Sequence, residues 1–164
     1  MAQESSGQTA PTGRIDGVHV KPLKVIPDQR GRLMEIFRCD DELFERFGQV
    51  YMTTAYPGVV KAWHYHEHQT DNWAVVQGMA LVGLYDQREG STTRGHVNAF
   101  HAGVHHPIFI QIPPGVMHGF KCISQEEVVV VNVPTMPYNR EQPDELRAPA
   151  DDPSIPFDWS RRDG

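Results

Sequence analysis

Short runs of β-branched and aromatic residues, separated by turn-forming residues, recur along most of the chain and constrain its fold more than any other feature. The runs are QVYMTTAY, VVKAWHYH, NWAVVQG, ALVGLYD, IFIQIP, HGFKCI and EVVVVNV. Runs of this kind, bounded by Gly, Pro, Asn or Asp, are typical of strands. Pro113, Pro114 and Gly115 add a turn signal, because proline presets φ and glycine accepts a positive φ. The pattern predicts an antiparallel sandwich or barrel.

One segment instead has a helical pattern. The stretch DDELFERFG, residues 40–48, has an aspartate that can cap a helix, an apolar stripe and a glycine that can close it. These residues are Asp40 or Asp41, then Leu43, Phe44 and Phe47, then Gly48. From residue 134 onward the chain is rich in proline and acids. We therefore expect an all-β fold with one short N-terminal helix and an irregular C-terminal tail.

Length and charge narrow the function classes. At 164 residues the chain is long enough for one well-buried domain. Its net charge of −6 disfavours a nucleic-acid partner, and no apolar run approaches the ~20 residues that span a membrane. We expect a disordered polar tail at residues 1–15, without the apolar core of a signal peptide, and a single domain at residues 16–164. With only Cys39 and Cys122 as cysteines, we expect a cytoplasmic protein.

The segment KAWHYHEHQTDN, residues 61–72, has the strongest chemical signal. Histidines occupy alternate positions at His64, His66 and His68, and Asp71 follows. Alternate residues of a strand share one face, so the imidazoles point the same way if the strand runs that far. Such a face is compatible with a metal cage, with a proton-abstracting site or with an exposed polar surface.

Two motifs place these histidines in a known context. The first has defining residues Gly58, His64, His66, Asp71 and Gly78, with aspartate in place of the usual glutamate. The second begins at Pro113 and includes His118, but it lacks its usual leading glycine and has Cys122 at its usual asparagine position. Together they resemble the two motifs of the cupins over roughly residues 50–135. This resemblance implies a jelly-roll β barrel in which the two motif strands meet.

A closer resemblance covers about residues 20–160. Five segments carry it in order: DQRGRLME (28–35), KAWHYH (61–66), DQREGSTTRG (86–95), IPPGVMHGF (112–120) and DPSIPFDW (152–159). The chain resembles the dTDP-4-dehydrorhamnose 3,5-epimerase family, which are cupins that work without metal. The resemblance implies an isomerase that acts on a dTDP-4-keto-6-deoxyhexose and needs no cofactor.

The resemblance also implies roles for individual residues. The hydrogens next to the 4-keto group are acidic enough to be removed by a positioned base, and histidine suits this role because its ordinary pKa lies near ~6.5. By resemblance, His64 is the base and Asp152 orients it, as an acid orients the histidine of a hydrolase triad. The residues expected to bind substrate are Arg30, Glu35, Gln49, Tyr51, Lys61, His118 and Tyr138. Arginine at position 30 suits a phosphate because its guanidinium offers paired donors.

Some family positions are changed in this chain. Lys61 replaces an arginine and lies at the wrong strand parity to share a face with His64, unless a bulge intervenes. Asp71 replaces a lysine, and Tyr51 replaces an asparagine. The tyrosine that acts as general acid in the family falls near Val131 or Asn132. Single-centre epimerisation, keto-isomerisation, and the use of Tyr51 as the acid therefore all stay open.

The same changes support a second class of function. His64, His66, Asp71 and His118 form a set of three histidines and one carboxylate, which suits a divalent transition metal such as Zn, Fe, Mn or Ni. A third class is a cupin that only binds a sugar or nucleotide. For all three we expect a homodimer, and the resemblance implies that partners exchange N-terminal strands, so that Arg30 or Glu35 serves the neighbouring pocket.

Overall fold

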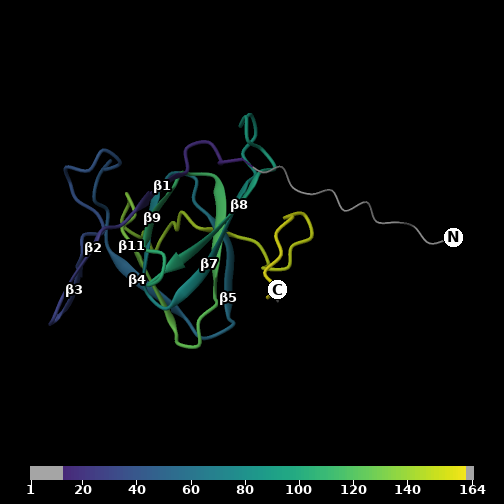
Figure 1. The fold of residues 1–164 in the computed structure, drawn as a ribbon. Helices are drawn as coiled ribbons and strands as arrows, with labels where there is room; N and C mark the ends of the chain where they lie inside the picture. The colour runs from purple at the N-terminus through teal and green to yellow at the C-terminus, as the bar shows by residue number, and fades with distance from the viewer. Residues whose placement is uncertain (1–12, 162–164) are drawn as a thin grey trace.

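The computed structural model describes residues 13–161, and in this range the chain is built from strands and irregular segments (Figure 1). The strands are β1 (His19–Pro22), β2 (Val25–Asp28), β3 (Gly31–Met34), β4 (Tyr51–Ala55), β5 (Val60–Tyr65), β6 (Asp71–Gln77), β7 (Met79–Asp86), β8 (Val97–Gly103), β9 (Ile108–Ile112), β10 (Val116–Cys122), β11 (Val128–Asn132) and β12 (Leu146–Arg147). The predicted all-β content is therefore confirmed. Within residues 13–161 there is no helix that could cross a membrane.

All of these strands except β2 and β3 form two packed sheets. One has the order β1-β9-β6-β11-β4 and the other the order β12-β5-β10-β7-β8, with antiparallel pairing throughout. The predicted closed barrel is wrong in this respect, because among the described residues no strand pairing joins the two sheets. The architecture is an open, cupin-like sandwich, since each sheet keeps two edge strands.

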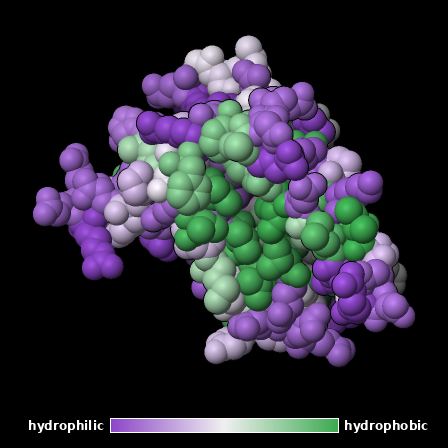
Figure 2. All heavy atoms as spheres, turned by 90° about the vertical axis from the view of Figure 1, so that its left-hand side faces the viewer, coloured by the Kyte–Doolittle hydropathy of each residue, from purple (hydrophilic) through white to green (hydrophobic). Residues whose placement is uncertain are grey.

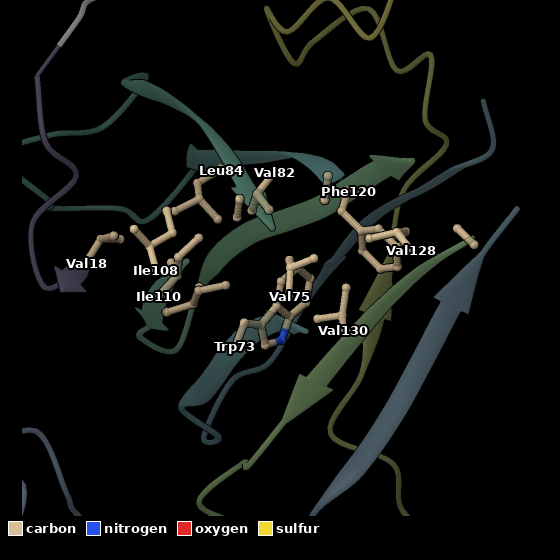
Figure 3. Close-up of a cluster of buried hydrophobic side chains, with 14 of the residues drawn as sticks. Val18, Trp73, Val75, Val82, Leu84, Ile108, Ile110, Phe120, Val128 and Val130 are labelled. Atoms are coloured by element: carbon tan, nitrogen blue, oxygen red, sulfur yellow. The ribbon is translucent and has the colours of Figure 1, made fainter. Parts of the chain in front are cut away.

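The core lies between the sheets and follows the alternation of each strand. Residues two apart on a strand point to the same face, and those on the inner face are apolar. They include Trp73, Val75, Val82, Leu84, Ile108, Ile110, Phe120, Val128 and Val130 (Figure 3). On β10 this inner series runs Val116, His118, Phe120, Cys122. The buried histidine thus occupies a position that would otherwise belong to the core.

The predicted helix at residues 40–48 is wrong. This part of the chain instead makes two short turns, in which the backbone N–H of Asp41 donates to the carbonyl of Arg38 at 3.2 Å and that of Phe44 donates to the carbonyl of Asp41 at 2.9 Å. The N–H of Gly48 donates instead to the distant carbonyl of Pro134 at 3.0 Å, and Phe47 is 62 % exposed. A nine-residue helix is marginal without a shared apolar face, and here Phe47 does not share the buried side of Leu43.

The C-terminal segment has little regular structure, as the sequence indicates, but it is well packed. Phe157 and Trp159 cover the outer face of β5, where the Trp159 ring lies 4.9 Å from the Trp63 ring, centroid to centroid. Gly83 makes room for them, because a Cβ there would lie 2.7 Å from Trp159. Residues 1–12 of the predicted tail lie outside the described residues, and Ile15, at its end, is buried in the core.

The β2–β3 hairpin stands apart from both sheets. Among the described residues it pairs only within itself, and Figure 1 shows it projecting from the body of the molecule. Figure 2 faces this side and shows hydrophobic side chains gathered in the middle of it. Exposed large apolar residues of this part of the chain are Ile26, Leu33, Phe47, Val50 and Met52. An apolar surface of this kind is typical of a contact with another molecule.

Candidate functional site

A pocket of about 1030 Å³ opens between the two sheets, large enough for a small ligand the size of a sugar nucleotide. One wall comes from β5 and the segment that follows it, and the opposite wall comes from β4. Residues 136–147, which are irregular up to β12, cover one side. Of the predicted site residues, Gln49, Tyr51, Lys61, His64 and Tyr138 all line this pocket. His66 lines it too.

The two motif histidines meet inside this region. His64 on β5 is directly opposite His118 on β10 in the strand pairing, and their ring centroids lie 4.1 Å apart. His118 is 1 % exposed and sits behind His64, which lines the pocket. The predicted meeting of the two motif strands is therefore confirmed.

A bulge brings Lys61 to the same face as His64. His118 pairs with His64, and Phe120 pairs with Lys61. Three steps along β5 therefore match two steps along β10, which leaves one extra residue in β5. Directly opposed residues of an antiparallel pair point to the same side, so the extra residue restores the parity that the sequence alone lacks. The Lys61 ammonium then donates to Thr53 Oγ1 across the pocket at 3.2 Å.

Asp71 stands at the centre of the histidine cluster and is 0 % exposed. Its Oδ2 lies 3.1 Å from His118 Nε2 and 3.4 Å from His66 Nε2. Its two oxygens also accept hydrogen bonds from Gln69 Nε2 at 2.7 Å and from Trp73 Nε1 at 3.2 Å. Burial alone would raise the pKa of Asp71, but the contacts with His118 and His66 hold that pKa well below its ordinary 3.8. The carboxylate is therefore ionised.

His118 and His66 each have oxygen atoms facing both ring nitrogens. For His118 these are the Val116 carbonyl, 2.9 Å from Nδ1, and Asp71 Oδ2. For His66 they are the Asp144 carbonyl at Nδ1 and Asp71 Oδ2 at Nε2. Burial lowers the pKa of His66, but the Asp71 carboxylate more than offsets this and raises that pKa above its ordinary 6.5. His66 can therefore hold a proton next to the carboxylate.

His64 differs from both of them. Among residues 13–161, neither of its ring nitrogens has a hydrogen-bond partner, although its ring stacks edge-on against His118. Burial first, and then the neighbouring His118, lower the pKa of His64 well below 6.5, and Asp71 opposes this only in part. The imidazole is therefore neutral at neutral pH, with a lone pair free to accept a proton from something bound in the pocket.

The opposite wall holds a phenol. The hydroxyl of Tyr51 on β4 accepts a hydrogen bond from Asn132 Nδ2 at 2.9 Å, across the β4–β11 pairing. Partial burial first, and then the charge of Asp71, raise the pKa of Tyr51 to about 12. The hydroxyl consequently keeps its proton at neutral pH.

Three predicted site residues lie elsewhere and are not among the residues that line this pocket. The Arg30 side chain, at the hairpin, donates to Asp28. Glu35 accepts from Arg38 at 2.9 Å. The Asp152 carboxylate accepts from the backbone N–H and the hydroxyl of Ser154, at 2.9 and 2.6 Å. The acid in contact with the histidine cluster is Asp71.

Sequence reasoning missed the contribution of the irregular segment. The Asp144 carboxylate accepts backbone hydrogen bonds from Glu67, His68 and Gln69 at 2.7 to 3.0 Å, and so ties this segment to the loop after His66. Arg147 pairs with His64 on the neighbouring strand and lines the pocket. A proline-rich segment without periodicity has no sequence signal for such contacts. His68, which the alternation placed with the other histidines, lies beyond the end of β5 at Tyr65. It is exposed and lines the pocket, but it is not part of the cluster around Asp71.

Comparisons with known proteins identify the family of the chain. Residues 26–146 match the family described as polysaccharide biosynthesis C-terminal domain. The chain is 44 % identical to the spore coat polysaccharide biosynthesis protein SpsL of Bacillus subtilis over 146 residues, covering 89 % of this chain and 97 % of the relative. It is 45 % identical to the probable low-salt glycan biosynthesis epimerase Agl13 of Haloferax volcanii over 148 residues, covering 89 % and 95 %.

Solved structures extend the comparison to the fold. A dTDP sugar isomerase from Desulfovibrio desulfuricans superposes with a TM-score of 0.85 and 33 % identity, covering 91 % of this chain and 94 % of that one. A dTDP-6-deoxy-D-glucose-3,5-epimerase from Legionella pneumophila, in complex with dTDP-4-keto-L-rhamnose, superposes with a TM-score of 0.79 and 25 % identity, covering 92 % and 82 %. The predicted resemblance to the dTDP-4-dehydrorhamnose 3,5-epimerases is thereby confirmed, and the chain belongs to the polysaccharide biosynthesis C-terminal domain family.

Proposed function

We propose that this protein is a nucleotide-sugar epimerase or isomerase that acts on a dTDP-4-keto-6-deoxyhexose by removing a proton next to the 4-keto group. The observation that carries the proposal is His64, a neutral imidazole with free ring nitrogens at the wall of a pocket large enough for the substrate. The similarity to the glycan biosynthesis epimerase Agl13 supports an epimerase, and the similarity to the Desulfovibrio isomerase supports a dTDP sugar as the substrate.

The base needs support when it becomes positively charged. His64 lies against His118, which contacts the ionised Asp71, so the negative charge of Asp71 reaches His64 through the intervening ring. We therefore assign the supporting acid to Asp71, since the Asp152 carboxylate is held by Ser154. The field of a buried carboxylate favours the imidazolium that forms during proton transfer, which lowers the barrier.

The cations of the pocket suit the other end of the substrate. Lys61 and Arg147 both line the pocket on the side of β5 and β12. A diphosphate carries negative charge that an ammonium and a guanidinium bind through charge-assisted hydrogen bonds. We infer that they hold the diphosphate and so set the distance between His64 and the sugar.

Hydrogen exchange tests the proposal directly. Protein in D₂O should introduce deuterium next to the carbonyl of dTDP-4-keto-L-rhamnose, detected by mass spectrometry. The His64→Asn variant should lose this exchange by at least ~100-fold, the usual effect of losing a general base, while its affinity for dTDP stays within about twofold. His105→Asn, at an exposed turn, is the matched control. Wild-type protein that binds dTDP without exchanging hydrogen would instead be a sugar- or nucleotide-binding cupin.

We further propose a homodimer in which each hairpin serves the other subunit. Arg30 and Glu35 do not line the pocket of their own chain, and the hairpin that leads to them projects with Ile26 and Leu33 exposed. A mixture of Arg30→Ala and His64→Asn proteins tests this. If Arg30 acts across the dimer, hybrids contain one intact site, and mixing should restore up to about a quarter of the wild-type rate. If Arg30 acts within its own chain, mixing restores nothing.

A metal-dependent version of the reaction is a second candidate, favoured by a separate observation. One donor atom from each of His64, His66, Asp71 and His118 lies within 4.8 Å of the others. His66 Nε2 is buried, and Asp71 Oδ2 faces it at 3.4 Å without the geometry of a hydrogen bond. The Nδ1 atoms of His66 and His118 face backbone carbonyls, an arrangement that directs Nε2 toward a metal. A divalent metal held there would stabilise the enolate oxygen as a Lewis acid.

Metal content separates the two versions. If the metal-free reaction is correct, protein purified without added metal should contain far less than one transition metal per chain and should keep its exchange activity in the presence of a chelator. If the metal version is correct, the protein should contain about one zinc, iron, manganese or nickel per chain by elemental analysis. In that case His66→Ala should lose the metal as fully as His64→Asn does, because every ligand contributes to affinity.

A further inference from the structure

Inversion at carbon needs a proton donor on the face opposite the base, and this inference rests on the proposed function above. Removal of the proton leaves a planar carbon. A base that returns the proton from its own side restores the original configuration. An epimerase of this type therefore needs a second group, with a transferable proton, across the sugar from His64.

The topology limits where that group can be. His64, Lys61 and Arg147 belong to the sheet that contains β5 and β12, so they share one side of the pocket. The opposite sheet reaches the pocket through its edge strand β4 and through Trp73 of β6, and among these residues Tyr51 is the one that presents an acidic O–H. The thymidine diphosphate sugar would thus lie between the imidazole and the phenol.

The hydrogen bonds around Tyr51 leave its proton free for transfer. Asn132 is buried, and its Oδ1 accepts from the backbone N–H of Asn72 at 2.9 Å, which fixes the orientation of the amide. The amide Nδ2 must then donate to the Tyr51 oxygen, at 2.9 Å. The Tyr51 hydroxyl therefore accepts from Asn132 and is left to donate its own hydrogen elsewhere.

We propose that Tyr51 delivers the proton that inverts the sugar carbon, and that Asn132 is the positioning residue that aims the phenol. His64 Nε2 or Nδ1 takes the proton as the C–H bond breaks, and the electron pair moves onto the carbonyl oxygen to form the enolate. The Tyr51 O–H bond then breaks as a new C–H bond forms on the other face, and the enolate electrons return to carbon. The phenolate, held by the Asn132 N–H, regains a proton from solvent, and His64 releases its proton there.

The chemistry of the phenol agrees with this role. Since its pKa is raised to about 12, Tyr51 is fully protonated before each turnover. Tyr138 is the other phenol that lines the pocket, but it belongs to the irregular C-terminal segment and is more exposed than Tyr51, 55 % against 38 %. Among the residues described, no side-chain hydrogen bond orients it; only its backbone N–H is held, by Gln49 at 3.2 Å. A donor must be aimed at one face of the carbon, and Tyr51 is the phenol whose oxygen is fixed.

The experiment measures exchange and inversion separately in D₂O, with dTDP-4-keto-L-rhamnose as the probe. Deuterium incorporation is followed by mass spectrometry and configuration by NMR. Tyr51→Phe should exchange hydrogen within about tenfold of wild type but form the epimer at least ~100-fold more slowly, because His64 still removes the proton and returns it to the same face. Asn132→Ala should lower the ratio of inversion to exchange in the same direction by a smaller factor. Tyr56→Phe, on an exposed tyrosine just beyond β4, is the matched control.

Each outcome decides the question. Inversion by Tyr51→Phe at the wild-type rate would overturn the proposal, as would a selective loss of inversion in Tyr138→Phe instead. Loss of exchange together with inversion in Tyr51→Phe, in protein that still binds dTDP, would assign Tyr51 to proton removal and also overturn it. Wild-type protein that exchanges no hydrogen would overturn the proposed function itself, and this inference with it.

Discussion

Asp71 and Asp86 are both completely buried, and the difference between their surroundings separates the candidate site from the scaffold. Asp86, at the end of β7, accepts hydrogen bonds from Arg88 at 2.8 Å, from Ser91 at 2.6 Å and from Thr93 at 2.6 Å. Asp71 instead faces the ring nitrogens of two histidines. Burial alone would raise the pKa of either carboxyl, yet these partners lower both values.

The partners differ in whether they can change protonation near neutral pH. An arginine and two hydroxyls keep their protons, so the charge of Asp86 is permanently paired and its role is to hold the loop after β7. Asp71 raises the pKa of His66 above 6.5, so His66 can change protonation near neutral pH and the charge of Asp71 can assist a proton transfer. A buried ionised carboxylate is therefore no sign of catalysis by itself, and the titration range of its neighbours is the more informative property.

The strongest test of this contrast is Asp71→Asn. Because the amide has no negative charge to support His64 through His118, we expect hydrogen exchange into dTDP-4-keto-L-rhamnose to fall by roughly 10²-fold or more. Near-UV circular dichroism checks that the variant is folded. Wild-type exchange in folded Asp71→Asn would remove Asp71 from the mechanism.

Asp86→Asn should have the opposite profile. Removing one partner of a fully buried ion pair costs about 3–5 kcal/mol. Because Arg88 is partly exposed, we expect a smaller loss, roughly 2–3 kcal/mol in urea unfolding. The exchange rate per folded molecule should stay at the wild-type value. A large loss of exchange without a loss of stability would show that the contrast with Asp71 is wrong.

Removing a single hydrogen bond from the same network should have a smaller effect. In Ser91→Ala, Asp86 keeps its bonds to Arg88 and Thr93, so we expect a loss of about 1 kcal/mol, the usual value for one hydrogen bond. Thermal unfolding of Ser91→Ala beside Asp86→Asn gives the comparison. Equal destabilisation by both changes would mean that the hydroxyl, rather than the arginine, balances the buried charge.

The smallest expected effect concerns pH at the histidine cluster. The pKa of His64 lies well below 6.5, so its neutral form persists as the pH falls to that value and is lost only at lower pH. The exchange rate should accordingly decline less than about twofold between pH 7.5 and 6.5. The measurement is a pH profile of deuterium incorporation at saturating substrate. An acid limb centred at or above pH 6.5 that is unchanged in His66→Asn, and so does not come from the raised pKa of His66, would contradict the assignment of His64 as the base.

The sequence by itself determined the β architecture, the meeting of the two motif strands and the family. Strand alternation is a local property with a period of two, so it is readable from neighbouring residues wherever one face is buried. The spacing of His64 and His118 within motifs likewise depends on short stretches of chain. The motifs can therefore be recognised without knowing which distant segments pair, but the meeting of their strands was implied only by the resemblance to the cupins.

Only the tertiary structure decided the features that depend on pairing register and on irregular segments. The helix expected at residues 40–48 is absent because Phe47 does not share the buried side of Leu43, and Gly48 bonds instead to Pro134, far along the chain. Lys61 faces the pocket because of a bulge opposite β10, a register shift that no local pattern records. Asp71 rather than Asp152 reaches the histidines because side chains from three strands converge between the two sheets. Convergence of this kind is a long-range packing outcome, which local sequence periodicity does not encode.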